Sequence, residues 1–388
     1  MSSSTIGTSS FTEQWLLATL KTSDSQFDGS SAVKSVKEIS GGKGFASKVY
    51  LCNVGSADVV LKVPEAGKLF EDSEDVEKCK EKNAAIYAMH ERECNFYDDF
   101  GFLNLVQTPK MFKTGKFGPG QEGFLLMESL ADRGGLDELV SGFNRHQLLN
   151  MARDFAQLQA HFLKQEDTTW IQKYEKSMLD STIPIVVGLF EKLKEMNEDL
   201  FGEGVDKLMP YVKDKGFYDY VTFHGYKELG LPPVLVHGNL WTNNIFWKLN
   251  KDGSVSNQAS AYIDWQLVHT GCLTSDLASV LVLCTEADIR RQFTEQVLQE
   301  YYDTLTAAMD GELSFTFDQV KELYKITLIG QCFNLMFAVV FQPAMIAHLS
   351  EPVREVQTQR LMYRAKYAMN DALAAIDELP EQFAHLKL

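Results

Sequence analysis

The sequence has no excess of positive charge. Of its 388 residues, 37 are Lys or Arg and 53 are Asp or Glu, so the formal net charge is −16 with His neutral. A chain this acidic repels the phosphate backbone of nucleic acids and anionic lipid head groups. We therefore expect no nucleic acid and no membrane among its partners, whereas a cationic small molecule is compatible with this charge.

Cysteine is also scarce. There are six cysteines, and no two of them have the spacing of a metal-binding pair. A chain of this length with so few cysteines is not a disulfide scaffold. The N-terminal segment is rich in Ser and Thr and lacks the basic and apolar stretches of a signal peptide. We therefore expect reduced, mostly buried thiols and a cytoplasmic location.

A membrane-length apolar run and two common catalytic motifs are missing as well. The most apolar segment, residues 328–341, contains Gln331 and Asn334 and falls short of the roughly 20 apolar residues that a membrane span needs. We predict a buried core helix there. The eight histidines include no His-x-x-x-His pair, and the chain has no Gly-x-Ser-x-Gly motif, so zinc-dependent and serine hydrolase chemistry have no support.

The first third of the chain contains strand-like segments. The composition of the whole chain, 45% hydrophobic and 23% charged, is that of a globular protein, and its length fits two to three domains. Apolar stretches bounded by turn residues predict a five-stranded antiparallel sheet, with strands at residues 33–39, 48–54, 59–63, 106–112 and 123–127. A capping box at residues 10–13 predicts the start of one helix, and a second helix is predicted over residues 83–100, after a charged connection.

The remainder is mostly helical in pattern. Apolar residues at helical spacing predict helices over residues 145–163, over residues 183–200 and from residue 288 to the end. Strand-like segments occur there only at residues 234–247 and 261–265. The sequence therefore predicts an α+β protein, with a small antiparallel-sheet lobe over residues 1–128 and a larger, mainly helical lobe over residues 129–388.

Three glycines lie between the first two predicted strands, at Gly41, Gly42 and Gly44. Because glycine has no side chain, phosphate oxygens can approach the backbone amides closely at such a segment. A strand follows it rather than a helix, so it is not the phosphate loop that ends in Gly-Lys-Ser/Thr. A plain hairpin turn is the alternative interpretation.

Lys62 lies among aliphatic residues in the third predicted strand. Its ammonium group could reach a phosphate if a carboxylate from the following helix held it in place. Glu93 is the candidate partner, and Glu91 is its competitor. In the alternative interpretation, Lys62 lies on an edge strand and contacts only solvent.

In the second half of the chain, two polar segments each follow a short stretch of apolar residues. The first runs from His237 through Asn239 to Asn244, and the second has Asp264 directly after Ile263. Phosphoryl transfer requires a metal ion held by carboxylate and amide oxygens, and a group that positions the acceptor hydroxyl. Asn244 and Asp264 are ligand types that suit a hard cation. Taken alone, Asp264 is equally well explained as a turn or helix-cap residue.

The order of these motifs resembles that of the kinase-like phosphotransferases that act on small molecules. This superfamily includes choline and ethanolamine kinases, aminoglycoside phosphotransferases and the CHK-kinase-like group, and the motifs here are most similar to those of nematode members of that group. The family motif His-Gly-Asp-x-x-x-x-Asn is matched by residues 237–244 except at one position, and its Ile-Asp-Trp motif by Ile263, Asp264 and Trp265. The resemblance covers most of the chain and implies a bilobal protein-kinase-like fold.

The resemblance implies an ATP site that uses the N-terminal lobe. The three glycines within residues 41–44 would cover the phosphates of ATP, and Lys62, paired with Glu93, would hold them. Met127 and Glu128 would lie at the hinge between the lobes, whose backbone meets the adenine ring. ATP and Mg²⁺ are the cofactors that this resemblance implies.

The resemblance also implies the catalytic and metal-binding roles. His237, Asn239 and Asn244 would form the catalytic motif, while Asn244 and Asp264 would bind Mg²⁺. Asp276 matches a family Asp that is mainly structural. The segment between Asp264 and Asp276 is too short for the peptide platform of protein kinases, so the expected acceptor is the hydroxyl of a small alcohol or amino alcohol.

Position 239 departs from the family motif. The family has Asp there, which takes the proton of the acceptor hydroxyl, whereas Asn239 can orient a hydroxyl but cannot accept a proton at neutral pH. General-base catalysis contributes about 10²–10⁴-fold, while positioning and charge stabilisation supply most of the acceleration of phosphoryl transfer. We therefore predict an impaired small-molecule kinase. Three explanations of Asn239 are open: a slow or repurposed natural kinase, a substitution engineered to trap a complex, and a pseudokinase that binds nucleotide, or nothing, and acts through a partner protein. A helical binding protein unrelated to kinases is the remaining alternative.

Overall fold

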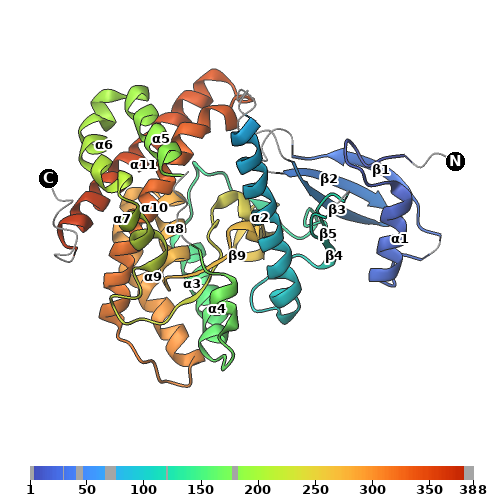
Figure 1. Ribbon diagram of the computed structural model, residues 1–388, viewed down its shortest axis with the longest axis horizontal. Coiled ribbons are helices and arrows are strands. Elements are labelled where there is room, and N and C mark those ends of the chain that lie inside the picture. The colour runs from blue at the N-terminus through green and yellow to red at the C-terminus, as the bar shows by residue number, and fades with distance from the viewer. Residues whose placement is uncertain are drawn as a thin grey trace. The chain divides into compact units, whose positions relative to one another are not determined.

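The computed structural model describes residues 4–28, 30–40, 47–65, 76–118, 121–176 and 182–379. The chain forms two compact units. The first comprises Met1–Gly134 and Ser260–Leu267, and the second comprises Gly135–Ala259 and Val268–Leu388. The first unit contains the main sheet and the second is mostly helical (Figure 1). The predicted α+β class, with a small antiparallel sheet and a mainly helical remainder, is confirmed.

The division between the units differs from the predicted boundary after residue 128. Residues 129–134 belong to the first unit, and the amide of Ser129 donates to the carbonyl of Asp58 at 3.2 Å. Ser260–Leu267 returns to the same unit from far along the chain. There the amide of Tyr262 donates to the carbonyl of Gln107 at 2.8 Å. Such long-range backbone hydrogen bonds leave no trace in local sequence pattern.

The sheet of the first unit has the predicted five antiparallel strands. They are β1 (Val33–Glu38), β2 (Ser47–Val54), β3 (Ala57–Pro64), β4 (Met111–Gly115) and β5 (Phe124–Glu128). Their order across the sheet is β1-β2-β3-β5-β4, and every neighbouring pair is antiparallel. The prediction of a strand over residues 106–112 is wrong for residues 106–110. These five residues have no regular secondary structure and lie directly before β4.

Two helices lie on opposite sides of this sheet (Figure 1). Helix α1 (Glu13–Ser23) packs on one face, where Leu16 and Leu20 join a buried cluster that includes Leu61 of β3. Helix α2 (Val76–Phe100) contacts β3 and β4. Side chains alternate between the faces of a strand. A residue of β3 that is out of phase with Leu61 therefore faces α2.

The starts of both helices differ from prediction. In α1 the N-cap is Thr12, whose hydroxyl accepts from the amide of Trp15 at 3.1 Å. The expected capping residue, Ser10, instead donates from its amide and its hydroxyl to the Glu122 carboxylate, each at 2.7 Å. Helix α2 begins at Val76, inside the segment that was expected to be a connection.

The second unit is built from helices joined by short strands. Its longer helices are α3 (Arg145–Leu163), α5 (Ile183–Met196), α6 (Glu198–Lys213), α8 (Ser275–Leu283), α9 (Ala287–Ala308), α10 (Phe317–Met345) and α11 (Glu351–Asp377). Two shorter helices are α4 (Thr169–Lys173) and α7 (Lys215–Asp219). The strands are β6 (Gly135–Leu136), β7 (Val234–Val236), β8 (Ile245–Leu249), β10 (His269–Gly271) and most of β9 (Val255–Tyr262). They form a β10-β7 pair and a β6-β8-β9 sheet.

Helix α10 contains the apolar segment for which a core helix is predicted. Among the described residues it is one helix whose length and composition would allow it to cross a membrane, and 72% of its most apolar window is buried inside the structure. Buried core helices of this length and composition have the same features. The helix continues through Pro343 to Met345.

The cysteines with described side chains are all buried and unbonded to one another. They are Cys52, Cys94, Cys272, Cys284 and Cys332. Burial raises the pKa of each of these thiols. The expectation of mostly buried, free thiols is therefore met for these five.

Candidate functional site

Lys62 is placed by the alternation of β3. The neighbouring Leu61 and Val63 face the α1 side of the sheet in a buried cluster, so Lys62 faces the α2 side. Its partner across the ladder is Leu125 of β5, which is fully buried. Only 12% of the Lys62 side chain is exposed. The alternative of a solvated lysine on an edge strand is therefore wrong, because β3 is a central strand.

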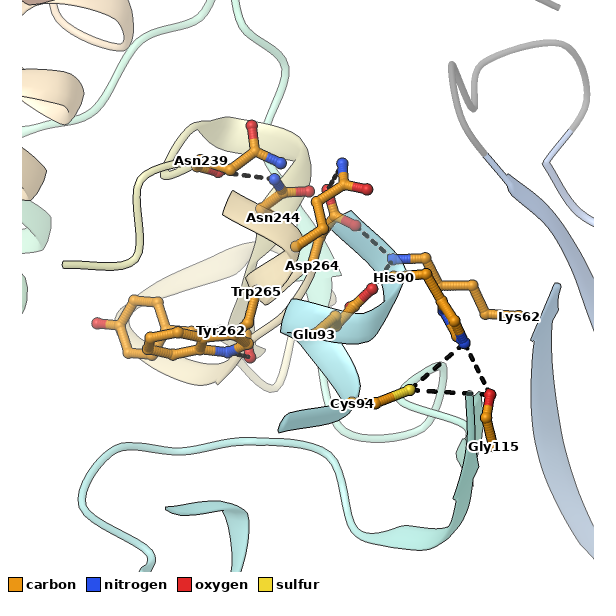
Figure 2. Close-up of polar contacts among 11 residues, drawn as sticks. Lys62, His90, Glu93, Cys94, Gly115, Asn239, Asn244, Tyr262, Asp264 and Trp265 are labelled. Carbon is orange, nitrogen blue, oxygen red and sulfur yellow. Dashed lines mark hydrogen bonds and ion pairs between the residues drawn. The ribbon is translucent and has the colours of Figure 1, made fainter. Parts of the chain in front are cut away.

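Two carboxylates hold the Lys62 ammonium group (Figure 2). Glu93 of α2 accepts from Nζ at 2.7 Å, and Asp264, two residues after the end of β9, forms a second ion pair with it. The predicted pairing of Lys62 with Glu93 is confirmed. Its competitor Glu91 is exposed and lies 3.8 Å from Lys116. All three groups of the cluster belong to the first unit.

The charges of this cluster do not balance. Burial disfavours the Lys62 ammonium ion, but the Asp264 and Glu93 carboxylates outweigh that effect and raise the pKa of Lys62. Burial raises the pKa of Glu93; Lys62 opposes the rise, and the Asp264 carboxylate adds to it. One ammonium group faces two carboxylates, so the ionised cluster has surplus negative charge. A divalent cation bound at Asp264 would neutralise that surplus.

Asp264 has an unusual backbone conformation. Its φ is +65°, a left-handed value that Asp and Asn tolerate better than most residues. One carboxylate oxygen pairs with Lys62, and the other accepts from Nε2 of Gln266 at 3.0 Å. Both oxygens are thus oriented by neighbouring side chains, a contribution of Gln266 that the motif alone did not predict.

An aromatic stack joins α2 to the segment that carries Asp264. The rings of Phe96 and Trp265 are parallel, with an interplanar angle of 8° and centroids 3.8 Å apart. Both side chains are buried, and Nε1 of Trp265 donates to the carbonyl of Tyr262 at 3.1 Å. Because Phe96 lies one turn from Glu93 on α2, the stack fixes Glu93 and Asp264 relative to each other. The sequence analysis missed Phe96, whose role depends on a contact between distant segments.

A buried histidine lies on the same helix. Nε2 of His90 is 2.8 Å from the carbonyl of Gly115 and 3.4 Å from Sγ of Cys94 (Figure 2). Burial lowers the pKa of His90 to about 4, and the Gly115 carbonyl opposes part of that shift. His90 is therefore neutral at physiological pH and adds no charge beside Lys62.

The structure gives the positions of only some of the other residues that are predicted to bind nucleotide. Gly41, Gly42 and Gly44 lie outside the described residues. Met127 is buried in β5 opposite Val60. Their roles toward ATP stay predictions.

Glu128 ends β5, where the hinge is predicted. Its carboxylate forms an ion pair with Arg133 and accepts from the amide of Lys110 at 2.8 Å. Its own amide donates to the carbonyl of Lys110 at 2.9 Å. The side chain of Glu128 thus holds neighbouring backbone in place, and contact of its backbone with adenine stays a prediction.

The predicted catalytic motif forms a loop in the second unit, between β7 and β8, that is held by internal hydrogen bonds. Nδ2 of Asn244 donates to the carbonyl of Asn239 at 2.7 Å (Figure 2). The amide of Asn239 donates to Nδ1 of His237 at 3.2 Å. His237 and Asn244 are buried, while Asn239 is half-buried. The three predicted catalytic residues are therefore neighbours in space.

Asp276 fixes the start of this loop. Its carboxylate accepts from the amides of His237 at 2.8 Å and Gly238 at 3.1 Å. Gly238 has a φ of +74°, which favours glycine there. Burial raises the pKa of Asp276 to about 7, against the two amide donors. This contact agrees with the structural role that the resemblance implies for Asp276.

The two residues that the resemblance assigns to Mg²⁺, Asp264 in the first unit and Asn244 in the second, each have a donor type that suits Mg²⁺ better than a transition metal. Asp264 offers carboxylate oxygens, and Asn244 offers an amide oxygen, which are the hard donors that Mg²⁺ prefers. Within the described residues, no three His, Cys, Asp or Glu side chains gather as a metal site. Mg²⁺ needs no such cage, because nucleotide phosphates and water complete its coordination.

Comparison with known families decides the relationship. Residues 56–378 match the family DUF1679, described as "Uncharacterized oxidoreductase dhs-27". The chain belongs to this family. Two curated relatives come from Caenorhabditis elegans. "Uncharacterized oxidoreductase dhs-27" is 26% identical over 374 residues, which are 91% of this chain and 45% of that protein. "Uncharacterized kinase-like protein D1044.1" is 24% identical over 257 residues, which are 65% of each chain. The chain thus spans less than two thirds of either relative.

Solved structures share the fold. A choline kinase from Cryptosporidium parvum Iowa II has a TM-score of 0.54 at 11% identity, covering 94% of this chain and 96% of that one. The GDP complex of aminoglycoside 2′-phosphotransferase-IIIa matches with a TM-score of 0.46 at 14% identity, covering 91% and 98%. The predicted superfamily and its kinase-like fold are confirmed.

The oxidoreductase name belongs to a relative of which more than half lies outside the match. Folds that bind nicotinamide dinucleotides use an open, mostly parallel sheet. The main sheet of this chain is antiparallel throughout. The fold described for this chain therefore lends no support to hydride transfer.

Proposed function

We propose that this protein is an ATP-dependent phosphotransferase that moves the γ-phosphoryl group to a hydroxyl of a small alcohol or amino alcohol. Mg²⁺ is the expected metal. The observation that carries the proposal is the buried Lys62 ammonium group, held between Glu93 of α2 and Asp264 after β9. A lysine fixed by a helical glutamate and set beside a metal-binding aspartate is the arrangement that kinases use on ATP phosphates.

Each member of the cluster has a separate task in this proposal. Lys62 would bind nucleotide phosphate oxygens, and Glu93 would keep the ammonium group charged and oriented. Asp264 and Asn244 would each supply an oxygen to Mg²⁺, which neutralises the charge that develops on the transferred phosphoryl group. Because Lys62 occupies one oxygen of Asp264 in the structure, nucleotide and metal binding requires that this pair loosen.

The catalytic loop would position the acceptor. The Asn239 amide oxygen can accept a hydrogen bond from a hydroxyl, and the bonds of its backbone to His237 and Asn244 fix its place. It cannot remove the proton, so we expect a rate lower than that of an Asp-containing relative by about 10²–10⁴-fold. The choline kinase fold likeness supports a small acceptor.

An ATP turnover assay with a panel of small alcohols and amino alcohols tests the proposal. The wild-type protein and Asn239→Asp are compared, and we expect the variant to turn over about 10²–10⁴-fold faster because it regains a general base. Asn239→Asp combined with Lys62→Met is the control, and it should return turnover to background. If the Asn239→Asp variant shows no ATP turnover with any acceptor of the panel, the enzymatic proposal fails.

A second candidate is a nucleotide-binding pseudokinase, which Asn239 itself favours. This candidate keeps the Lys62 cluster but predicts no phosphoryl transfer, even after Asn239→Asp. ATP binding measured by calorimetry without turnover in either form would support it. Absence of ATP binding in both forms would exclude both candidates.

A further inference from the structure

A cavity of about 590 Å³ lies in the second unit, beside α3 and the β8–β9 hairpin. This volume is in the range of small-molecule sites, roughly 300–1,000 Å³. None of the residues assigned above to phosphoryl transfer lines it. It is therefore distinct from the proposed catalytic site.

The lining of this cavity has one sign of charge. Three basic side chains, from His146, Arg153 and Lys248, line it together with four amide side chains and one serine. No carboxylate is among its lining residues. In a chain with 53 acidic and 37 basic residues, such a lining favours an anionic ligand.

Arg153 is held in place before any ligand binds. Its Nη1 donates to Oδ1 of Asn150 at 2.7 Å, and Nδ2 of Asn150 donates to the carbonyl of Asn257 at 2.7 Å. Its Nε pairs with Glu300 of α9 at 2.6 Å. Within the described residues, no partner occupies its Nη2. With Nε and Nη1 engaged in this way, Nη2 is the guanidinium nitrogen that can donate to a phosphate oxygen.

Lys248 supplies charge that its neighbours do not cancel. Its Nζ donates to the neutral amide oxygen of Gln258 at 3.2 Å. Among the described residues, no carboxylate lies within ion-pair distance of it. Arg153 is neutralised in part by Glu300, so Lys248 is the side chain that gives the cavity its net positive charge.

One part of the cavity is apolar. Leu149 of α3 is buried, while Leu249 at the end of β8 is 45% exposed, and both line the cavity together with Val255. An exposed leucine next to cationic groups suits a ligand with an organic portion beside its anionic group. Inorganic phosphate alone would leave this apolar surface uncovered.

We propose that this cavity binds a phosphate monoester of a small organic molecule. Arg153 and Lys248 contact the phosphate, while Leu149 and Leu249 contact the organic portion. The amide side chains complete the hydrogen bonds of the phosphate oxygens. Neither the family description nor the relatives name a ligand at this place.

Methyl NMR spectroscopy of leucine-labelled, full-length protein tests this site, with phenyl phosphate as the probe. We expect saturable shifts of the Leu149 and Leu249 methyl signals, and at least tenfold weaker shifts per concentration with inorganic phosphate. Lys248→Gln should weaken phenyl phosphate binding by about tenfold or more, since it removes a charge-assisted hydrogen bond. Lys207→Gln is the matched control, because Lys207 is an exposed lysine of the same unit and is paired with Glu203. The affinity of this variant for phenyl phosphate should equal that of the wild type.

Lys62→Met separates this site from the proposed nucleotide site. We expect it to leave the Leu149 and Leu249 shifts unchanged. Loss of the shifts in Lys62→Met but not in Lys248→Gln would assign the probe to the nucleotide site and overturn the inference. So would no saturable shift at millimolar phenyl phosphate, or equal binding of phenyl phosphate and inorganic phosphate. Failure of ATP turnover, by contrast, would leave this binding result unaffected.

Discussion

At the residue scale, the Lys62 cluster has a direct consequence for stability. Removing one member of a buried ion pair leaves an uncompensated charge, which typically costs about 3–5 kcal/mol. We expect Lys62→Met to lower the free energy of unfolding by this amount at neutral pH, because Glu93 and Asp264 then repel each other without a cation between them. Urea unfolding measures it.

The surface pair Lys116–Glu91 provides the matched control. It also joins a lysine of the sheet side to α2, but at 3.8 Å and with both side chains largely exposed. Exposed pairs contribute about 0–1 kcal/mol, so Lys116→Met should be nearly neutral. Equal losses in the two variants would contradict the burial of the Lys62 cluster as the cause.

His90 leads to a pH prediction. Its pKa is lowered to about 4 by burial, with a smaller opposing effect from Gly115, whereas an unfolded histidine titrates near 6.5. The folded protein therefore binds fewer protons than the unfolded chain between these values. The stability due to neutral His90 is fully present above about pH 6.5 and is lost as the pH falls toward 4.

Unfolding free energies of the wild type and His90→Gln, measured from pH 7 to pH 4.5, check this. We expect the wild type to lose more stability over that interval than the variant, in which no imidazole titrates. Parallel curves would show that His90 is protonated as easily in the folded protein as in the unfolded chain.

Some contacts of the Lys62 cluster can be predicted from the sequence, and others cannot. Glu93 could be named as the candidate partner of Lys62 because it lies on the helix that follows the strand, whereas Asp264 was predicted as a metal ligand and not as a second partner of this lysine. Phe96 and Gln266 could not, since each is significant only through a side-chain contact. Nothing in the local pattern distinguishes Phe96 from Tyr97, the buried aromatic residue next to it on α2.

At the element scale, α11 is anchored by a buried arginine. The Arg364 side chain is fully buried, and its guanidinium group donates to the carbonyls of Leu139 at 2.7 Å and Leu283 at 2.8 Å. It also pairs with Glu286 at 2.7 Å. Arg364→Met leaves these acceptors buried without their donor, so we expect a loss of about 3–5 kcal/mol in unfolding free energy.

Arg360, one turn earlier on α11, is the matched control. It pairs with the same Glu286 at 3.1 Å, but about half of its side chain is exposed. Arg360→Met should therefore cost no more than about 1 kcal/mol. Thermal and urea unfolding of both variants compare them. A similar cost for the two would mean that the carbonyl contacts of Arg364 add little.

Element boundaries show the limits of periodicity. The helix predicted over residues 183–200 is in fact two helices, because Asn197 leaves the helical conformation and caps α6 by accepting from the amide of Leu200 at 3.1 Å. Apolar spacing continues across this break, so the pattern alone indicates one helix. Similarly, Pro109 in the predicted fourth strand cannot donate a ladder hydrogen bond, and β4 begins only at Met111.

At the scale of the whole molecule, the sequence predicted the order of a sheet unit and a helical unit but not their membership. Strand and helix patterns are local, so they identified the sheet and most helices. The assignment of Ser260–Leu267 to the first unit depends on two hydrogen bonds that join residues more than a hundred positions apart: Arg133 donates to the carbonyl of Ser260, and the amide of Tyr262 donates to the carbonyl of Gln107. Asp264 therefore belongs to the sheet unit, although the longer segments on either side of Ser260–Leu267 belong to the helical one.

Binding of ATP with Mg²⁺ should stabilise the folded protein. Ligand at one hundred times its dissociation constant adds about 2.7 kcal/mol to the unfolding free energy, which corresponds to a rise of several degrees in Tm for a protein of this size. We expect that rise in wild type with ATP and Mg²⁺ together. Asp264→Asn should lose the part of the rise that depends on Mg²⁺, because an amide is a weaker ligand for a hard cation than a carboxylate.

Asp310→Asn controls for the backbone. Asp264 and Asp310 both have left-handed φ values, +65° and +61°, and Asn tolerates this conformation as Asp does. Asp310 is exposed and pairs with Lys164 at 3.2 Å, so its variant should keep the full Tm rise. No rise in the wild type would contradict nucleotide binding, while a rise of equal size and Mg²⁺ dependence in Asp264→Asn would remove Asp264 as a metal ligand. Because both variants share the same backbone geometry, a difference between them measures the carboxylate of Asp264 and not strain in the chain.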